Sequence, residues 1–540
     1  MVRNPILRGF NPDPSICRVG DDYFIATSTF EWYPGVQIHH SRDLANWRLR
    51  CRPLDRPALL DLAGVPDSCG VWAPCLSWHD GLFWLCYSVV FRFDGNFKDT
   101  HNYLTTARSI DGEWADPVYL NSSGFDPSLY HAEDGRKWYL NMVWDHRPDR
   151  TFFGGITLQE YSSAARRLVG SRKFIFDGSR FGCTEGPHLY RFDDYFYLMT
   201  AEGGTGYEHV VTMARSKNIG GPYELDPGGP IVTSRHAPEH PLQRAGHGDL
   251  VDSPDGRHYL VHLCSRPLPG TRRSPMGRET AIQEVERTDE GWFRLVQGGQ
   301  LPALEVVMSA RECGREPGMA GGEATDCQRD TFDRPVLPAQ YQWLRSSRPA
   351  DLFSLEERPG YLRLFGRESL GSLYHQALVA RRQQHFSYQA ETEIWFEPEH
   401  FQQMAGLVCY YNSSKFHYLY ISRDDEVGKH LAVMSCSGEL SLNAQFPNYW
   451  DRVPVPENRP LFLRVRVDRH SLVFSWSADG DDWLELPLAL DASVLCDEAG
   501  KGEGAHFTGA FVGMCCQDLA GTRLPADFAR FSYRALDAQS

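Results

Sequence analysis

Three acidic residues in the first half of the chain share a local setting, each next to or near a proline and just before a stretch expected to form a strand. Asp13 lies in Asn-Pro-Asp-Pro-Ser, Asp126 in Phe-Asp-Pro-Ser-Leu-Tyr, and Glu185 in Thr-Glu-Gly-Pro-His-Leu-Tyr. Carboxyl groups held close together do not ionise alike, because each charge raises the pKa of its neighbours. One can then stay protonated as an acid while another acts as a base, which is the requirement for cleaving a glycosidic bond.

Positioning these residues requires a repeating framework, and the chain has one. Five segments share a turn with Asp or Gly followed by an aromatic strand, and their aligned aromatic residues are spaced by 59, 55, 58 and 63 positions: Phe24, Phe83, Trp138, Phe196 and Tyr259. Asp-Gly and Asp-Asp tolerate the positive φ of tight hairpin turns. About four strands in such a period are typical of a propeller blade. We therefore predict a five-bladed β-propeller over residues 1–302. A stacked solenoid is less favoured, because no helical period separates the strands.

The acids occupy equivalent slots of this repeat. The residues found 10 to 12 positions before the aligned aromatics are Asp13, Ala73, Asp126, Glu185 and His247. In a propeller the first strand of each blade lines the central channel, so these positions should form a ring around one mouth of that channel. We expect Asp13, Asp126 and Glu185 to converge there, with Trp72 and His247 in the two remaining slots.

Aromatic residues accompany the acids. Phe30, Trp32, Trp72 and Trp144 lie just after or beside the ring positions, and flat aromatic faces suit the C–H surfaces of sugar rings. Carboxyl groups flanking a bond within an aromatic pocket predict glycoside hydrolysis. Phe30 and Trp72 are equally compatible with a role in the propeller core.

Each site residue also has a purely structural interpretation. A single Asp13 or Glu185 in such a motif is most often a turn or cap residue, and only the repetition favours catalysis. His247, in Gly-His-Gly-Asp, is compatible with a buried and hydrogen-bonded histidine. Arg278, in Met-Gly-Arg-Glu-Thr, is compatible with an ordinary ion-pair partner.

The second half of the chain has a different pattern. Residues 303–330 carry Gly, Pro and acids with little periodicity and are predicted to be a linker. Residues 331–540 contain alternating strands, for example Phe462–Val467, which is typical of antiparallel sheets with one face in water. The whole chain is therefore predicted to be all-β, a five-bladed β-propeller followed by a jelly-roll-like β-sandwich. The glycine-bearing stretch that begins at Phe507 could reach the propeller mouth.

Composition limits the partners and the compartment. The 55 Lys and Arg against 70 Asp and Glu give a net charge of −15, which argues against nucleic acid or an anionic membrane as main partner, since phosphate binding needs clustered Lys and Arg. The 14 cysteines include no CxxC pair and no zinc-type spacing. No signal peptide and no apolar run of membrane-spanning length is evident. We therefore predict a cytoplasmic protein with reduced thiols.

At this point the motifs resemble those of a known family. The chain resembles glycoside hydrolase family 43, and more narrowly the two-domain β-xylosidases of that family. The resemblance includes the stretch 507–517 and six ordered motifs that span nearly the whole propeller. These motifs are Asn11–Ser15, Ser28–Trp32, Val71–Pro74, Phe125–Ser128, Thr184–His188 and Gly277–Thr280.

The resemblance implies an inverting, exo-acting enzyme that removes xylose from the non-reducing ends of β-1,4-xylooligosaccharides. It implies that Asp13 is the general base that activates water and that Glu185 is the general acid that protonates the leaving oxygen. Asp126 would raise the pKa of Glu185 and orient it. Asp13 and Glu185 belong to blades one and four, which are not adjacent in a ring of five. They should therefore face each other across the channel, which suits the roughly 6.5–9.5 Å gap that inversion needs.

The resemblance also implies how substrate is held. Arg278 and His247 would hold the sugar or the acid cluster, and Phe507 would close the pocket from the sandwich. No cofactor is expected to be required, although His247 leaves room for a structural calcium ion near the propeller axis, as in some relatives. Because relatives are often dimers or tetramers, a homo-oligomer is expected. The predicted substrate-binding residues are Phe30, Trp72, Trp144, Thr205, His247, Arg278 and Phe507.

Three other functions stay open at this level. An α-L-arabinofuranosidase, alone or as a second activity, could use the same site, because a furanose of similar shape fits it. Retaining fructosidases with a propeller and a sandwich carry a different early motif, Asp-Pro-Asn-Gly, which the N-terminal region lacks. A non-catalytic sugar-binding propeller is the third alternative, and three mutually repelling acids argue against it.

Overall fold

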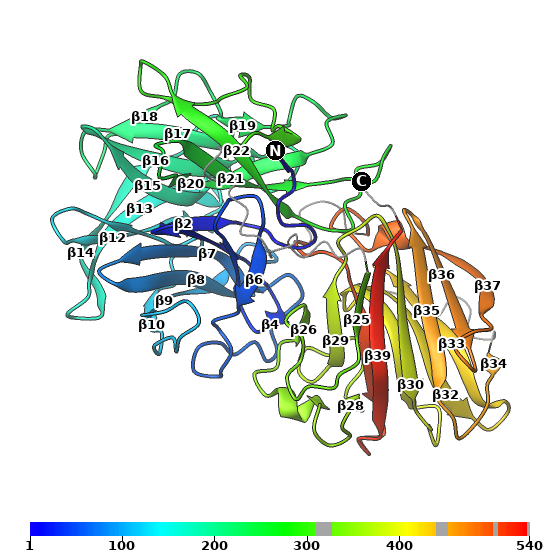
Figure 1. The fold of residues 1–540 in the computed structure, drawn as a ribbon. Helices are drawn as coiled ribbons and strands as arrows, with labels where there is room; N and C mark the ends of the chain where they lie inside the picture. Colours follow the sequence, from blue (N-terminus) through cyan, green and yellow to red (C-terminus); the bar gives the residue numbers. More distant parts are fainter. Residues whose placement is uncertain (309–326, 439–451, 501–505, 537–540) are drawn as a thin grey trace.

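The chain folds into two β domains that lie side by side (Figure 1). The structure is a computed structural model, and it describes residues 1–308, 327–438, 452–500 and 506–536. In the described residues, five blade sheets and one two-stranded sheet form the N-terminal domain, and two large sheets form the C-terminal domain. In the described parts, the helical elements are two single 3₁₀ turns, Pro349–Asp351 and Ala492–Val494. The predicted fold class, a five-bladed propeller followed by a β-sandwich, is confirmed.

Each propeller blade is an antiparallel sheet built from consecutive strands. Blade one contains β2 (Ser15–Val19), β3 (Asp22–Thr27), β5 (Gln37–Ser41) and β6 (Arg48–Cys51). Blade two contains β7 (Gly70–His79), β8 (Leu82–Arg92), β9 (Asp99–Ala107) and β10 (Val118–Asn121). Blade three contains β11 (Ser128–His131), β12 (Lys137–Trp144), β13 (Phe153–Ser162) and β14 (Arg167–Phe176). Blade four contains β15 (Glu185–Phe192), β16 (Tyr195–Glu202), β17 (Val210–Ser216), β18 (Glu224–Leu225) and β19 (Val232–Thr233). Blade five contains β20 (Gln243–Asp252), β21 (His258–Ser265), β22 (Glu279–Arg287) and β23 (Phe293–Leu295).

The first strands of the five blades form a closed ring. Each of β2, β7, β11, β15 and β20 contacts the first strands of its two neighbours, and β20 contacts β2. The N-terminal segment lies against blade five, where β1 (Val2–Arg3) pairs with β24 (Glu305–Val306) and Asn4 donates to the Ile282 carbonyl at 2.8 Å. These contacts tie the two ends of the propeller together.

The aromatic repeat marks the same place in every blade. The five aligned aromatics all lie near the start of the second strand, in β3, β8, β12, β16 and β21. There they pack between blades, as Phe24 does against Phe83, with ring centroids 5.3 Å apart. The aligned aromatic residues therefore occupy equivalent positions in the five blades. The acids that precede them in sequence likewise lie at equivalent positions, at the start of the first strands.

The C-terminal domain is a sandwich of two antiparallel sheets. One sheet contains β25 (Cys327–Asp330), β27 (Phe353–Ser354), β28 (Leu362–Phe365), β30 (Ser387–Trp395), β35 (Leu461–Asp468), β36 (Ser471–Ser477), β37 (Leu484–Asp491) and β39 (Pro525–Ala535). The other contains β4 (Trp32–Tyr33), β26 (Tyr341–Leu344), β29 (Ala377–Arg382), β31 (Gln403–Asn412), β32 (Lys415–Asp424), β33 (Gly428–Ser437), β34 (Val453–Pro454) and β38 (Phe511–Asp518). Strand β35 shows the predicted alternation, because every second residue from Leu461 to Val467 is buried, whereas Phe462 and the charged residues between them are partly or fully exposed.

Two short strands lie within the stretch 303–330 that the sequence predicts to be a linker. Strand β24 belongs with the propeller through its pairing with β1, and β25 pairs with β39 of the sandwich. Residues 309–326, which form most of the predicted linker, lie outside the described residues. Strand pairing therefore extends into both ends of this stretch.

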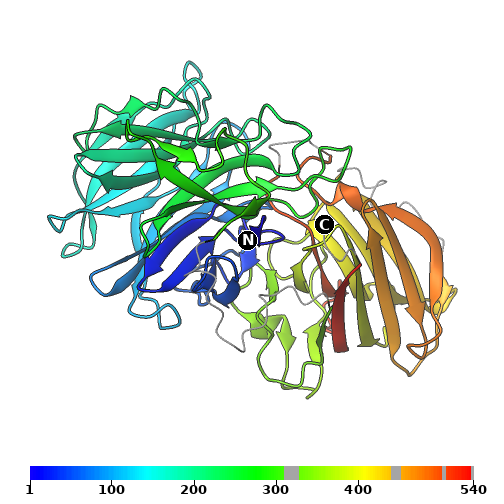
Figure 2. The same ribbon diagram turned by 45° about the horizontal axis from the view of Figure 1, so that its top comes forward.

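The domains share an interface that the repeat does not predict. Strand β4 leaves blade one and pairs with β26 at the edge of a sandwich sheet. Trp32 in β4 is fully buried and stacks on Phe511, with ring centroids 3.7 Å apart and planes inclined by 13°. Buried Arg345 donates to the Val65 carbonyl at 2.6 Å and to Asp67 at 2.7 Å. This extensive interface accounts for the close packing of the two domains seen in Figure 2.

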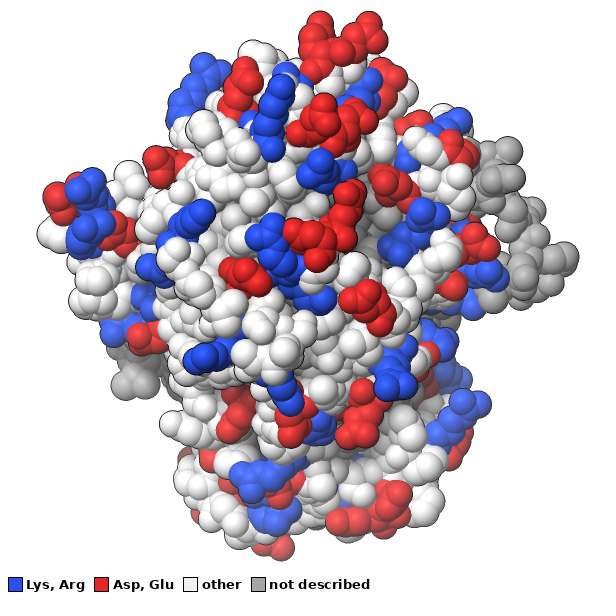
Figure 3. All heavy atoms as spheres, turned by 90° about the vertical axis from the view of Figure 1, so that its left-hand side faces the viewer, with Lys and Arg blue, Asp and Glu red and all other residues white. Residues whose placement is uncertain are grey.

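The outer surface offers no extended patch of one charge in the view of Figure 3, which faces the propeller side of the molecule. Lys and Arg are interspersed there with Asp and Glu. The expectation that nucleic acid is not a partner stays a prediction. Among the described residues, no helix has the length and apolar character needed to cross a membrane.

Candidate active site

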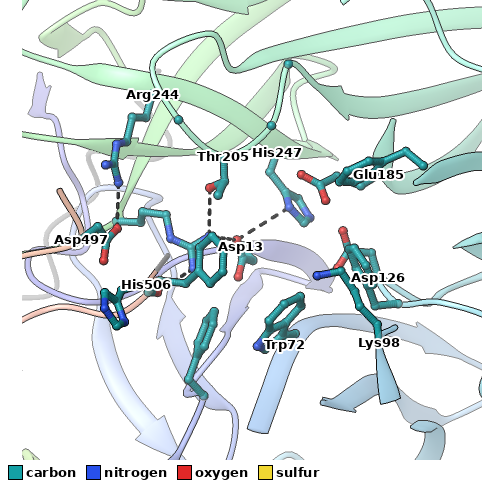
Figure 4. A pocket seen from close by; sticks show the side chains of 18 residues that line it. Asp13, Trp72, Lys98, Asp126, Glu185, Thr205, Arg244, His247, Asp497 and His506 are labelled. Carbon is teal, nitrogen blue, oxygen red and sulfur yellow. Dashed lines mark hydrogen bonds and ion pairs between the residues drawn. The ribbon is translucent and has the colours of Figure 1, made fainter. Parts of the chain in front are cut away.

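The three predicted acids line one cavity at the mouth of the propeller channel (Figure 4). Its volume is about 320 Å³, within the range of sites for small molecules. Trp72 and His247 occupy the other two slots of the ring, as the repeat predicts. The cavity is lined by Asp13, Phe30, Trp72, Lys98, Phe125, Asp126, Phe153, Glu185, Gly203, Gly204, Thr205, Gly206, Arg244, His247, Arg278, Asp497, His506 and Phe507.

An unusual backbone conformation recurs in the ring. Asp13 and Asp126 both have a φ of 55°, and His247 has a φ of 43°. The left-handed region costs a non-glycine residue roughly 1–2 kcal/mol, and such residues cluster at functional sites. Gly186, next to Glu185, also has a φ of 55°, and a Cβ atom there would lie 2.9 Å from His247 Nε2. Only glycine therefore allows the imidazole to approach this closely.

Asp13 accepts hydrogen bonds from both sides. Ser28 Oγ donates to its Oδ2 at 2.7 Å, and Arg278 Nη1 donates to its Oδ1 at 3.0 Å. His247 Nδ1 lies 3.7 Å from the same Oδ1. Burial lowers the pKa of His247 to about 4 although the charge of Asp13 opposes this shift, so the imidazole is neutral at pH 7 and the contact is not an ion pair. Arg278 is the cation that accompanies Asp13.

Asp126 and Glu185 form a coupled pair. The backbone N–H of Gly186 donates to Asp126 Oδ2 at 3.0 Å, which holds Asp126 beside the residue that follows Glu185. Burial, then the charges of Asp126 and Asp13, raise the pKa of Glu185 well above its usual range. Burial and the charge of Asp13 raise the pKa of Asp126 to about 8. Both carboxyl groups therefore hold a proton more strongly than an exposed acid does.

Lys98 brings a second cation that sequence reasoning missed. Its Nζ lies 4.3 Å from the ring centroid of Trp144 and 5.5 Å from that of Trp72. Burial lowers the pKa of Lys98 to about 8, and the charge of Glu185 opposes this shift. Lys98 lies between β8 and β9, in a loop with no counterpart in the aligned repeat, so only the folded loop reveals it.

Aromatic rings form the walls of the cavity. Trp72 lies 5.7 Å from Phe30 and 5.8 Å from Phe507, measured between ring centroids. The Arg278 guanidinium lies over Phe30 and Phe507, 5.2 and 5.8 Å from their centroids. Arg278 also donates to Thr205 Oγ1 at 3.1 Å, so a single guanidinium joins Asp13, Thr205 and an aromatic wall.

The sandwich completes the cavity, as expected from the stretch after residue 506. Arg278 Nη2 donates to the Phe507 carbonyl at 2.8 Å. Asp497 and His506 also line the cavity, and Asp497 accepts from Arg244 Nη1 at 2.8 Å. Of these residues, the sequence predicts only Phe507. Arg244, Asp497 and His506 were not predicted, because contacts between different domains leave no periodic signal.

Two predicted aromatics lie elsewhere. Trp144 is not among the residues that line the cavity; it packs 6.3 Å behind Phe125 and donates to the Asn96 carbonyl at 3.0 Å. Phe125, which precedes Asp126, lines the cavity in front of Trp144. Trp32 lies in the domain interface, because β4 turns away from the channel to join the sandwich.

The described residues contain no group of three or more His, Cys, Asp or Glu side chains arranged to hold a metal ion. His247, the residue for which the sequence left room for calcium, has its Nδ1 directed at Asp13. The calcium ion stays a prediction.

Comparison with known proteins bears on the chemistry. The sequence model of glycosyl hydrolases family 43 matches residues 2–293, and that of the beta xylosidase C-terminal concanavalin A-like domain matches residues 329–534. The chain is 51% identical to xylosidase/arabinosidase 43B of Humicola insolens, over 100% of this chain and 98% of that protein. It is 48% identical to beta-xylosidase of Bacillus subtilis, over 99% of each. The crystal structure of xylan beta-1,4-xylosidase from Bacillus halodurans C-125 superposes with a TM-score of 0.93 at 49% identity, covering 99% of this chain and 100% of that one.

Proposed function

The chain belongs to glycosyl hydrolase family 43, and on that premise we propose that it is an exo-acting β-D-xylosidase. Its substrates are short β-1,4-xylooligosaccharides, from which it releases xylose at the non-reducing end. The observation that carries this proposal is the convergence of Asp13, Asp126 and Glu185 in one aromatic-walled cavity beside Arg278. Paired carboxyl groups that flank a bond are the machinery of glycoside hydrolysis.

In the proposed mechanism Glu185 acts as the general acid. Its pKa is raised well above the usual range of a glutamate, which favours the protonated form. That form can transfer a proton to the glycosidic oxygen as the bond to the anomeric carbon breaks. Burial raises this pKa most, and the charge of Asp126 raises it further as Asp126 loses its proton with rising pH. The Gly186 N–H holds Asp126 in place.

Asp13 acts as the general base. It removes a proton from a water molecule, whose oxygen attacks the anomeric carbon on the face opposite the leaving group, so the configuration inverts. Arg278 and Ser28 orient the carboxylate for this step. Inversion needs roughly 6.5–9.5 Å between acid and base. The placement of the two residues in non-adjacent blades, with blade five between blades one and four, favours such a gap.

The sugar at the end of the chain lies between Phe30, Trp72 and Phe507. Their rings suit the C–H faces of a xylose, while Arg278 offers donors to its hydroxyl groups. Phe507 reaches the cavity from the sandwich and narrows it. A cavity closed at one end, which the family resemblance implies, favours exo action, because it accepts a chain terminus and excludes the middle of a polymer.

Hydrolysis of xylobiose followed by proton NMR tests the proposal. The first sugar formed should be α-xylose, which mutarotates only afterwards. A β product would rule out the inverting mechanism, and failure to hydrolyse xylobiose would rule out the xylosidase activity itself.

An α-L-arabinofuranosidase activity is the second candidate. It is favoured by the name of the Humicola insolens relative, which joins both activities. Parallel assays with chromogenic β-D-xyloside and α-L-arabinofuranoside measure the ratio of the two kcat/KM values. A ratio well above one for the xyloside supports the main proposal, and a reversed ratio replaces it.

We also propose a cytoplasmic location and a homo-oligomer, a dimer or tetramer. The free cysteines among the described residues, most of them buried, suit a reducing compartment. Detection of the tagged protein in the cell contents, and not in the medium, tests the first. Light scattering, which measures the mass of the particle, tests the second.

A further inference from the structure

A buried polar cluster lies in the first strands of the propeller, beyond the ring that carries the three acids. Its central residue is Asp249 in β20, two residues after His247. Asp249 is 5% exposed and is not among the residues that line the candidate active site. A sugar bound in that cavity does not touch Asp249, so any effect of Asp249 on the reaction must act through its neighbours.

The two oxygens of the Asp249 side chain bond to two different blades. Oδ2 accepts from Ser15 Oγ and from the Ile16 backbone N–H, both at 2.9 Å and both in β2 of blade one. Oδ1 accepts from Tyr190 Oη, in β15 of blade four, at 2.5 Å. His188 Nδ1, in the same strand, lies 3.5 Å from Oδ1. Because Asp249 itself belongs to blade five, a single carboxyl group joins blades one, four and five.

Backbone groups hold the two hydroxyl donors in place. The N–H of Leu76, in β7 of blade two, donates to Ser15 Oγ at 3.0 Å. The N–H of Leu250 donates to Tyr190 Oη at 3.0 Å. Each hydroxyl therefore accepts a bond from a backbone N–H and gives its own hydrogen to Asp249. The cluster is fixed from both sides of the carboxyl group.

The two strands bonded to Asp249 carry the proposed base and the proposed acid. Ser15 lies two residues after Asp13 in the chain, and Tyr190 lies five residues after Glu185. Blades one and four are not adjacent in the ring, and blade five lies between them. Asp249 is therefore placed to set the position of one strand relative to the other.

The backbone beside this cluster has conformations that need support. Asp13, two residues before Ser15, has a left-handed φ of 55°, and His247, two residues before Asp249, has a φ of 43°. Such conformations persist at non-glycine residues only where the surrounding structure holds them. The hydrogen bonds of Ser15 and Asp249 begin directly after these two residues, where they can hold the backbone.

We propose that Asp249 is a positioning residue, which sets the separation between Asp13 and Glu185 across the channel. This inference rests on the proposed function, because an inverting hydrolase needs a defined gap between acid and base. A shift of either strand changes that gap, and a misplacement of about 1 Å can lower a rate about 10²-fold.

Asp249→Asn in the full-length protein tests the proposal. The amide keeps one acceptor oxygen and places an NH₂ group where the second oxygen was, so it can accept bonds from only one of the two blades. We expect kcat on xylobiose to fall by about 10- to 100-fold. The KM value should change little, because the residues that line the cavity are retained. An unchanged kcat in the folded variant would overturn the proposal.

Variants of the two donors test whether the effect passes through both blades. Ser15→Ala removes a donor of blade one and Tyr190→Phe removes a donor of blade four, and each should lower kcat. Combined with Asp249→Asn, the loss in kcat should be smaller than the product of the separate losses, because the residues act as one unit. Independent losses, or no loss in either donor variant, would overturn the proposal. The donor variants also serve if Asp249→Asn fails to fold.

Asp226→Asn is the matched control. Asp226 is 2% exposed and joins the outer strands of blades four and five, where its Oδ1 accepts from Arg294 Nη2 at 2.7 Å. This variant should lower the unfolding temperature and leave kcat and KM unchanged at temperatures where it stays folded. An equal fall in kcat in both aspartate variants would show a general loosening of the propeller and overturn the proposal.

The wild type separates this inference from the proposed function. A wild type that does not hydrolyse xylobiose would overturn the proposed function and this inference with it. An active wild type with an equally active Asp249→Asn variant would overturn the inference alone.

Discussion

The backbone N–H of Phe507, in the sandwich, donates to the hydroxyl of Ser68, in the propeller, at 3.0 Å. Ser68 has a left-handed φ of 62°, and its carbonyl accepts from Trp72 Nε1 at 3.0 Å. Its own N–H donates to Glu31 Oε2 at 3.2 Å. One serine therefore positions two aromatic walls of the active-site cavity, one from each domain.

Ser68→Ala should raise KM for xylobiose by about two- to tenfold, since one net hydrogen bond contributes roughly 0.5–1.5 kcal/mol. The kcat value should change less, because the acids are untouched. The control is Ser413→Ala, which removes a hydroxyl donor to Asp67 at the same domain interface without contact with Phe507. Equal KM shifts in both variants would indicate a general loosening of the interface.

Glu185→Ala should lower kcat/KM on xylobiose by roughly 10²–10⁴-fold, the usual contribution of general acid catalysis. It should retain much more activity on an aryl xyloside with a good leaving group, which needs little protonation. Asp13→Ala should lose activity on both substrates, because the attacking water is no longer deprotonated. Near-normal rates for Asp13→Ala would contradict its assignment as the base.

Asp126→Asn should move the alkaline limb of the pH profile of kcat/KM to lower pH. The charge of Asp126 raises the pKa of Glu185, so its removal lets Glu185 lose its proton earlier as pH rises. Lys98→Met should move the same limb in the opposite direction, because the Lys98 charge lowers that pKa. Shifts of the same sign in both variants would contradict this electrostatic account.

Glu31→Gln should make stability less dependent on pH. Burial and the charge of Asp67 raise the pKa of Glu31 from 4.5 to about 8. Between these values the folded state keeps a proton that the unfolded state has lost, so stability falls as pH rises, by up to about 3–5 kcal/mol. The variant lacks this loss, and its unfolding temperature relative to wild type should increase from pH 5 to pH 8. Glu113→Gln, at an exposed position of the same domain, should show no such trend.

Trp32→Ala should destabilise the protein by about 3–5 kcal/mol, the range for large aromatic truncations in cores. The indole is fully buried and stacks on Phe511 between the domains. Denaturant unfolding measures the loss, and Phe401→Ala, at a side chain 64% exposed, is the control. A similarly small effect in both variants would show that the stacked pair contributes little to domain docking.

Much of the propeller was predictable because its information is periodic. Phe24, Phe83 and their counterparts recur at nearly constant spacing since every blade must pack against the next one. A residue at a given distance before them therefore lies at the same place in each blade. This relation alone brings Asp13, Asp126 and Glu185 to one channel mouth, and the alternation of buried and exposed residues in strands such as Leu461–Asp468 predicts the sandwich.

The tertiary structure alone decided which side chains complete the cavity. Lys98 and Ser68 lie in loops outside the repeat. Trp144, at the end of β12, packs against Phe125 and does not line the cavity. Trp32 lies in the domain interface and not beside the acids, because β4 pairs with a strand of the sandwich. Phe507 contacts Ser68, which is 439 residues away in sequence. Such contacts depend on how loops fold and how two domains dock. They are set by shape and hydrogen bonding between distant segments, which leave no period in the sequence.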